Sequence, residues 1–358
     1  MALYIGCDAH RKFSVFVSVD SSNRESAPQR VEHDHEAMET YLEGFPLGSE
    51  VALEASGGWY WLVDLMESCG LMVHLADPLE AKKRMRGRNK TDALDARGLA
   101  YLLRDGRLPE IWIPPAELLD LRGLLRARLS LRQRQSALKC RVNSALNRYG
   151  LKQNRELRQD LFTGRGRVEL AVMIQRLPKS TRLATQAEWD LIDQMERHIG
   201  TLEDSLLRQL HVDARRQLLT SLPGIGRVLS ATILLEVGEQ ARFPTAGHLC
   251  SYAGLVPRVF ASGGKTRHGR TPVDCNHYLK WAFVEAANCI VWNRRRYENH
   301  HVIRLYDKIR QRSNHGKAAV ALARHLAEAA WHVLQKNQPY REPAPSAVSS
   351  SANGSARC

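Results

Sequence analysis

Four acidic side chains in the first hundred residues have the types and spacing of a divalent-metal site. Asp8 ends an apolar, strand-like run, and Glu54 lies within another such run. Asp92 and Asp95 stand three residues apart in a helix-like segment, so both carboxylates project from one helix face. Hard divalent cations take oxygen ligands and share them with substrate phosphates. We therefore predict a Mg²⁺ or Mn²⁺ site suited to phosphodiester chemistry, in which metal ions activate one oxygen and stabilise another.

The elements that must position these acids form a predicted α/β domain over residues 1–108. Runs typical of strands occur at 2–9, 13–19, 50–56 and 71–76, and helical patterns occur at 35–45, 58–70 and 91–106. Thr91 is the expected N-cap of the last helix, and Gly106 is its expected end. Strands followed by alternating strands and helices indicate a mixed sheet flanked by helices.

A helical middle region is predicted over residues 109–215, after a boundary marked by Pro109, Pro114 and Pro115. A long helix is expected from Ala116 to about Arg148, and a second over 186–210, which would pack against the first as a hairpin or form a dimerisation arm. In the first helix one apolar position recurs every seven residues, at Leu124, Leu131, Leu138 and Ala145. The companion positions are only half apolar, so the pattern favours a coiled coil without requiring a continuous one.

The first long helix is strongly basic. Between Asp120 and Gly150 the only acid is Asp120, and the basic residues are Arg122, Arg126, Arg128, Arg132, Arg134, Lys139, Arg141 and Arg148. A helix face of one charge sign favours phosphate contacts over an ordinary solvated face, on which acids would be interspersed.

Two glycine-containing motifs mark the predicted C-terminal domain, residues 216–341, which is mainly helical. The turn "LPGIG" contains Gly224 and Gly226 and is either a phosphate-binding helix–hairpin–helix turn or a tight turn between packed helices. Further on, Ser262 precedes two glycines and a basic group formed by Lys265, Arg267, His268 and Arg270. Glycines expose a serine and cations stabilise developing negative charge, although such a serine is more often structural than nucleophilic. Residues 342–358 are expected to be a disordered tail.

Composition narrows the class of partner. The chain of 358 residues has 52 Lys+Arg against 38 Asp+Glu, a net charge of +14. Such a balance favours a polyanion, and nucleic acid is preferred to a membrane because no apolar run approaches the roughly 18 residues of a spanning helix. The seven cysteines are scattered without CxxC pairs, so we expect a reduced, cytoplasmic protein with neither a disulfide framework nor a zinc site.

Five motifs occur in an order that resembles a known family. They are "YIGCDAH", "LEASGGWY", "NKTDALDA", "LPGIG" and "YAGLVPR…SGGKTRHGR". From about Leu3 to Tyr340 the chain resembles the insertion-sequence one-ten family of transposases, bridge-RNA-guided DEDD recombinases related to the Piv-type DNA invertases. The resemblance implies a RuvC-like, RNase H-fold domain whose metal ligands are Asp8, Glu54, Asp92 and Asp95. It also implies a coiled-coil region and a C-terminal transposase domain in which Ser262 attacks DNA.

The resemblance further implies partners and a mechanism. Double-stranded donor and target DNA would pair with a structured guide RNA, and the protein would act as a homo-oligomer, a dimer or a tetramer. The absence of a long apolar run separately predicts no membrane association. Ser262 would form a 5′-phosphoserine bond with DNA and free a 3′-OH for strand exchange. Two alternatives remain open, a Holliday-junction nuclease that uses metal-activated water and a non-catalytic nucleic-acid-binding protein.

Overall fold

The computed structural model describes residues 2–85, 91–151, 160–262 and 264–343. The chain forms two compact units, Met1–Pro114 and Pro115–Cys358. The predicted tail lies outside the described residues beyond Pro343, whereas its first residue, Glu342, accepts hydrogen bonds from the His301 backbone N–H and from Tyr340 Oη. Within the described ranges, no helix combines the length and the apolar character needed to span a membrane.

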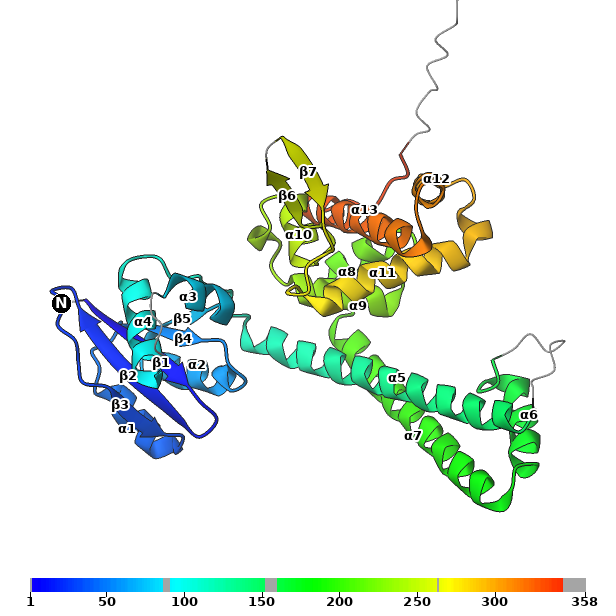
Figure 1. Ribbon diagram of the computed structural model, residues 1–358, viewed down its shortest axis with the longest axis horizontal. Coiled ribbons are helices and arrows are strands. Elements are labelled where there is room, and N and C mark those ends of the chain that lie inside the picture. Colours follow the sequence, from blue (N-terminus) through cyan, green and yellow to red (C-terminus); the bar gives the residue numbers. More distant parts are fainter. Residues whose placement is uncertain (1, 86–90, 152–159, 263, 344–358) are drawn as a thin grey trace, which may run out of the picture. The chain divides into compact units, whose positions relative to one another are not determined.

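The first unit contains a five-stranded sheet in the order β3-β2-β1-β4-β5 (Figure 1). β1 pairs antiparallel with β2 and parallel with β4, so the sheet is mixed, as predicted. The strands are β1 (Leu3–Ala9), β2 (Phe13–Asp20), β3 (Gln29–Glu32), β4 (Glu50–Glu54) and β5 (Met72–Ala76). The helices are α1 (His35–Glu43), α2 (Trp59–Ser68), α3 (Pro78–Arg84) and α4 (Asp92–Arg104). The sequence patterns did not predict β3 or α3.

Both faces of this sheet are covered, because alternate residues of the central strands join different cores. On one face Ile5, Cys7 and Phe16 pack with the buried residues of α1 and α2, such as Met38 and Leu62. On the opposite face, small side chains lie beneath α4, which packs against β1, β2 and β4. The helix begins as predicted, since the Thr91 side chain accepts a hydrogen bond from the Leu94 N–H at 3.3 Å.

The second unit begins with a pair of long helices, α5 (Ala116–Arg148) and α7 (Lys179–Gln209), which pack against each other (Figure 1). The pair is antiparallel, because Arg128 bonds Glu203 while Arg141, farther along α5, bonds Glu188. Between them α6 (Gly164–Gln175) closes the far end over an apolar cluster that includes Val142, Leu146 and Ile192. The predicted long helix therefore exists, with the expected bounds.

The buried seam of this hairpin differs from the predicted one. Buried residues recur every seven positions in both helices, at 128, 135 and 142 in α5 and at 185, 192, 199 and 206 in α7. The apolar series predicted as the seam, Leu124, Leu131, Leu138 and Ala145, is only half-buried. The series that is buried instead contains Arg128 and Gln135, whose Nη2 and Nε2 atoms donate hydrogen bonds to Glu203 and Glu196 of α7.

The remainder of the second unit is mainly helical, as predicted, and is built on one apolar core that also includes Leu125 and Leu206 of the long helices. A two-stranded hairpin, which the sequence patterns did not predict, is its only sheet in the described residues. The elements are α8 (Ala214–Thr220), α9 (Arg227–Val237), η2 (Gln240–Arg242), α10 (Ala246–Tyr252), β6 (Val259–Ser262), β7 (Lys265–His268), α11 (His277–Trp292), η3 (Arg294–Tyr297), α12 (His301–Arg310) and α13 (His315–Lys336).

Candidate functional site

The carboxyl ends of two parallel strands bring Asp8 and Glu54 to the same edge of the first unit's sheet. Cys7 of β1 lies opposite Leu53 of β4, so Asp8 and Glu54 are the next residues along this parallel pair. Side chains two apart in a strand share a face, which puts Asp8 on the face of Gly6 and Glu54 on that of Ala52. This face is the one that α4 covers. The edge at the carboxyl ends of parallel strands is also where ligands bind in α/β sheets.

Gly6 explains how α4 comes close enough for its acids to meet Asp8. A Cβ atom at Gly6 would lie 1.9 Å from the backbone oxygen of Ala96 and 2.7 Å from the nitrogen of Ala100, so the strand and helix touch through their backbones. Asp92 precedes Ala96 by one helical turn, while Asp8 follows Gly6 by two residues on the same strand face. The first turn of α4 therefore lies over the carboxyl end of β1.

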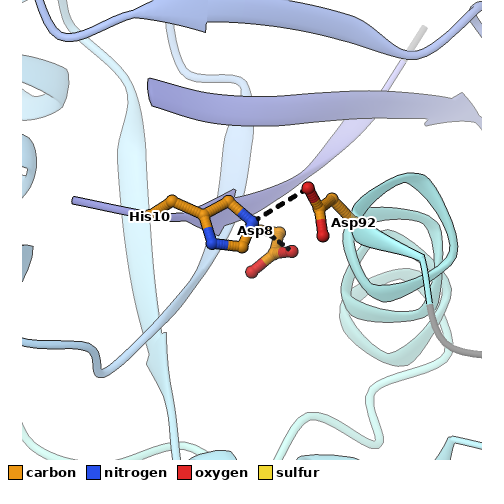
Figure 2. A group of neighbouring side chains, drawn as sticks. All are labelled: Asp8, His10 and Asp92. Carbon is orange, nitrogen blue, oxygen red and sulfur yellow. Dashed lines mark ion pairs between the residues drawn. The ribbon is translucent and has the colours of Figure 1, made fainter. Parts of the chain in front are cut away.

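Asp8 and Asp92 are joined by a histidine that the sequence analysis did not assign to the site. Nε2 of His10 lies 3.3 Å from Oδ2 of Asp8 and 3.2 Å from Oδ2 of Asp92 (Figure 2). One ligand atom from each of the three residues lies within 4.8 Å of the others. The available signal was the spacing, since His10 follows Asp8 by two residues, as a neighbour on one side of an extended chain would.

Burial and neighbouring acids make Asp8 the most perturbed carboxyl of this group. Burial raises the pKa of Asp8 to about 6, while His10 lowers it and Asp95, Glu54 and Asp92 raise it. All four predicted acids therefore interact electrostatically at this edge, although contact through His10 joins only Asp8 and Asp92. Clustered carboxylates repel one another unless a cation lies among them.

This donor set is chemically suited to a divalent cation. Asp8 is buried, Glu54 and Asp95 are half-buried, and Asp92 is 45 % exposed at its side chain. The group offers carboxylate oxygens and one imidazole nitrogen, which divalent ions bind in proteins. Because the Asp92 side chain is partly exposed, a phosphate could approach an ion bound there and become one of its ligands.

Ser262 lies in the second unit, as the last residue of β6, and it is exposed. It pairs across the β6–β7 hairpin with Lys265, and the positive φ of Gly264, 75°, belongs to the hairpin turn between them. Arg267 and Arg270 are also exposed, whereas Gly263 and the side chains of Lys265 and His268 lie outside the described part of the chain. The serine is thus accessible, in the same hairpin as the exposed Arg267.

The basic face predicted for α5 is not of one charge sign in the folded chain. Acids from other helices pair with five of its cations: Arg122, Arg126, Arg128, Arg132 and Arg141. Arg122 and Arg128 are buried, so the expectation that these two contact nucleic acid is corrected. Lys139 lies 5.2 Å from the centre of the Phe162 ring, and Arg134 is exposed without an ion-pair partner among the described residues. Arg134 is therefore free to bind a phosphate, as is Arg148, which is also exposed without an ion-pair partner among the described residues.

The pairs at the base of α5 form a buried network around Glu236. This carboxylate is fully buried in α9 and accepts two hydrogen bonds from Arg126, both at 3.1 Å, and one from Asn276 at 2.8 Å. Arg122 donates to the backbone oxygens of Leu235 and Glu236 at the C-terminal end of α9. This network, which the sequence did not predict, fastens the long hairpin to the helical core.

The "LPGIG" turn joins α8 to α9, and its two glycines differ in role. Gly224 has a φ of 75°, and a Cβ there would lie 2.4 Å from the backbone oxygen of Ala286. Its N–H donates to Tyr297 Oη at 3.2 Å, so packing and an internal hydrogen bond account for Gly224. Gly226 is the N-cap of α9 and faces open space. Of the two glycines, only Gly226 is therefore placed to contact a phosphate.

Comparison with known proteins yields two family matches. Residues 5–151 match a family model described as a transposase, of the DEDD type of IS110. Residues 216–301 match the transposase IS116/IS110/IS902 family. These findings support an IS116/IS110/IS902 family transposase. Its N-terminal match contains all four acids, and its C-terminal match contains Ser262.

Curated relatives agree with this family. The chain is 27% identical over 303 residues to a probable family 20 transposase of Pseudomonas aeruginosa, covering 81% of this chain and 85% of that protein. It is 24% identical to the transposase for insertion sequence element IS1111A of Coxiella burnetii, covering 81% and 79%. It is 26% identical to an insertion element IS116 protein of Streptomyces clavuligerus, covering 96% and 97%. A transposase of this family implies DNA cleavage and strand transfer, and a DEDD type implies use of a divalent metal.

Proposed function

We propose that the chain is the transposase of an insertion sequence and that it cuts and rejoins DNA through Ser262, assisted by Mg²⁺ or Mn²⁺ held by Asp8, Glu54, Asp92 and Asp95. The observation that carries the metal assignment is the gathering of four acids at one edge of the sheet, where burial and then the charges of Asp95, Glu54 and Asp92 raise the pKa of Asp8. A bound divalent ion would supply positive charge to the phosphate that reacts.

In this proposal Ser262 Oγ attacks the phosphorus of a DNA phosphodiester. The new bond joins Oγ to phosphorus, the bond to the 3′ oxygen breaks, the serine loses its proton and the 3′ oxygen gains one. The product is a 5′-phosphoserine and a free 3′-OH, which can attack the phosphoserine of another strand. Exposure of Ser262, Arg267 and Arg270 supports access of a phosphate to this part of the chain.

The partners of this reaction are double-stranded donor and target DNA and a structured guide RNA that pairs with both. If base pairing with the guide RNA recognises the DNA sequence, the protein needs only to bind backbone phosphates. Arg134 and Lys139 of α5, Gly226 at the start of α9 and Lys265, Arg267 and Arg270 are the proposed contacts, and the net charge of +14 suits this role. We also propose that the protein acts as a homo-oligomer, either a dimer or a tetramer.

A denaturing gel of labelled DNA tests the serine step. Wild-type protein, guide RNA and Mg²⁺ should give a shifted band that protease treatment removes. Ser262→Ala should retain nucleic-acid binding but lose both cleavage and the shifted band, whereas the neighbouring control Ser251→Ala should keep both. Full cleavage by Ser262→Ala would contradict the covalent mechanism and favour a nuclease that uses metal-activated water. Loss of cleavage in Asp8→Asn with intact binding would separate the metal requirement from nucleic-acid binding.

A further inference from the structure

The imidazole of His10 lies between two of the acids at a spacing that fits a shared ion. Its Nε2 is 3.3 Å from Asp8 Oδ2 and 3.2 Å from Asp92 Oδ2 (Figure 2). Donor atoms that share one ion at about 2.1 Å lie about 3.0 Å apart at right angles and about 3.4 Å apart at the tetrahedral angle. Both separations fall within this interval, so Nε2 lies at the distance from each carboxylate oxygen that two ligands of one ion would have, and the three ligand atoms lie within 4.8 Å of one another.

The His10 ring is held in its orientation by the turn between β1 and β2. Its backbone N–H donates to the Phe13 carbonyl at 2.9 Å, and its ring lies 4.7 Å from that of Phe13, measured between centroids. The guanidinium of Arg30 covers Phe13 at 3.6 Å from the ring centre. These contacts orient the ring so that Nε2 points toward the two carboxylates.

We propose that His10 is a nitrogen ligand of the metal centre that Asp8 and Asp92 form, and that it shifts the preference of this centre from Mg²⁺ toward Mn²⁺. The inference rests on the proposed metal site and adds a ligand to the four acids. Mg²⁺ prefers oxygen donors and retains water, whereas imidazole nitrogen raises affinity for transition ions more than for Mg²⁺. The competing interpretation is that His10 is only a countercharge for the acids, in which case a divalent ion would displace it.

Ion binding to the full-length protein distinguishes these roles without any measure of recombination. Binding of Mn²⁺ is followed by the electron paramagnetic resonance signal of the free ion, and binding of Mg²⁺ by its competition with Mn²⁺. His10→Phe keeps a ring to pack on Phe13 but removes the nitrogen donor. It should weaken Mn²⁺ binding at least about tenfold and Mg²⁺ binding less than about threefold. His10→Asp replaces nitrogen by oxygen and should raise the affinity for Mg²⁺ relative to Mn²⁺.

The controls separate failure of this inference from failure of the proposed metal site. His35→Phe changes an exposed histidine of the same unit, 74% exposed at its side chain, and should leave both affinities unchanged. If His10→Phe binds Mn²⁺ as tightly as wild type, or more tightly, while Asp8→Asn loses both ions, His10 is a countercharge and the inference is overturned. If Asp8→Asn also binds both ions normally, the metal site itself is contradicted. Should His10→Phe not fold, as judged by circular dichroism, the ratio measured for His10→Asp decides.

Discussion

Asp8 is buried and has three neighbouring acids, and this combination lowers the free energy of unfolding of the metal-free protein at neutral pH. Burial, first, and then Asp95, Glu54 and Asp92 raise its pKa to about 6 against the opposing effect of His10. An acid whose pKa is raised by folding stabilises the fold fully below its unfolded pKa, near 3.8, and this contribution is lost as pH rises through about 6. The ionised carboxylate is therefore destabilising at neutral pH unless a cation compensates it.

Asp8→Asn should accordingly raise the free energy of unfolding of the metal-free protein at pH 8 by about 2–3 kcal/mol, because a shift of one pKa unit corresponds to about 1.4 kcal/mol. At pH 4 the gain should nearly vanish, since the wild-type carboxyl is then protonated in the folded state. Urea unfolding in EDTA at both pH values measures the difference. A gain of equal size at pH 4 and pH 8 would show that ionisation of Asp8 is not its source.

At the scale of elements, the contact between β1 and α4 determines where Asp92 and Asp95 lie. Gly6→Ala would place a Cβ atom 1.9 Å from the Ala96 carbonyl oxygen, a backbone atom that cannot rotate away. We expect α4 to shift, the free energy of unfolding to fall by about 1–3 kcal/mol and divalent-ion binding to weaken. Thermal unfolding and Mn²⁺ titration measure the two effects.

Gly57→Ala is the matched control for this change. Gly57 lies in the loop after Glu54, and a Cβ atom there would meet nothing within 4 Å. This variant should retain both stability and ion binding. Normal ion binding by Gly6→Ala would mean that the position of α4 does not govern the acids.

The Glu236 network should be essential for the junction between the long hairpin and the helical core. Glu236→Ala removes the fully buried carboxylate that pairs with Arg126 and Arg122, and we expect a loss of roughly 3–5 kcal/mol in the free energy of unfolding. Glu328→Ala removes a surface pair with Arg324 and should cost less than about 1 kcal/mol. Urea unfolding compares the two, and equal losses would contradict a structural role for the network.

For the whole molecule, the net charge of +14 overstates the charge that α5 offers to nucleic acid, because acids neutralise most of its arginines. Arg134→Gln should weaken nucleic-acid binding and lower the slope of log affinity against log salt concentration by about one. Arg141→Gln, in which a cation paired with Glu188 at 2.5 Å is lost, should leave the slope nearly unchanged. Fluorescence anisotropy at several salt concentrations measures both, and equal slopes for the two variants would contradict this distinction.

Much of the architecture could be predicted from local patterns. The strand-like runs, the Thr91 cap and the extent of α5 each depend on residues that are close together in the sequence. Contacts distant in sequence could not be predicted in this way. The partners of Arg128 and Arg126 lie 75 and 110 residues away, at Glu203 and Glu236, so a charge count along one helix could not find them. The gathering of acids was predictable because strand ends of a parallel pair meet at one edge. His10 was missed because it lies just beyond the strand that carries Asp8, so that its spacing of two residues from Asp8 was the only local signal.

Buried positions recur every seven residues in both α5 and α7, and this recurrence limits how the hairpin of these two helices can change in length. Gln135 donates to the Ile192 carbonyl and to Glu196, so a slip of the helices past each other would leave a buried amide unsatisfied. An insertion or deletion can keep this pairing only if it adds or removes seven residues in both helices together. Each such step would move the distal end by about 10.5 Å, at 1.5 Å per residue. The length of the α5–α7 hairpin is thus restricted to steps of seven residues in each helix. The corresponding hairpins of related chains should differ in length by whole multiples of this step.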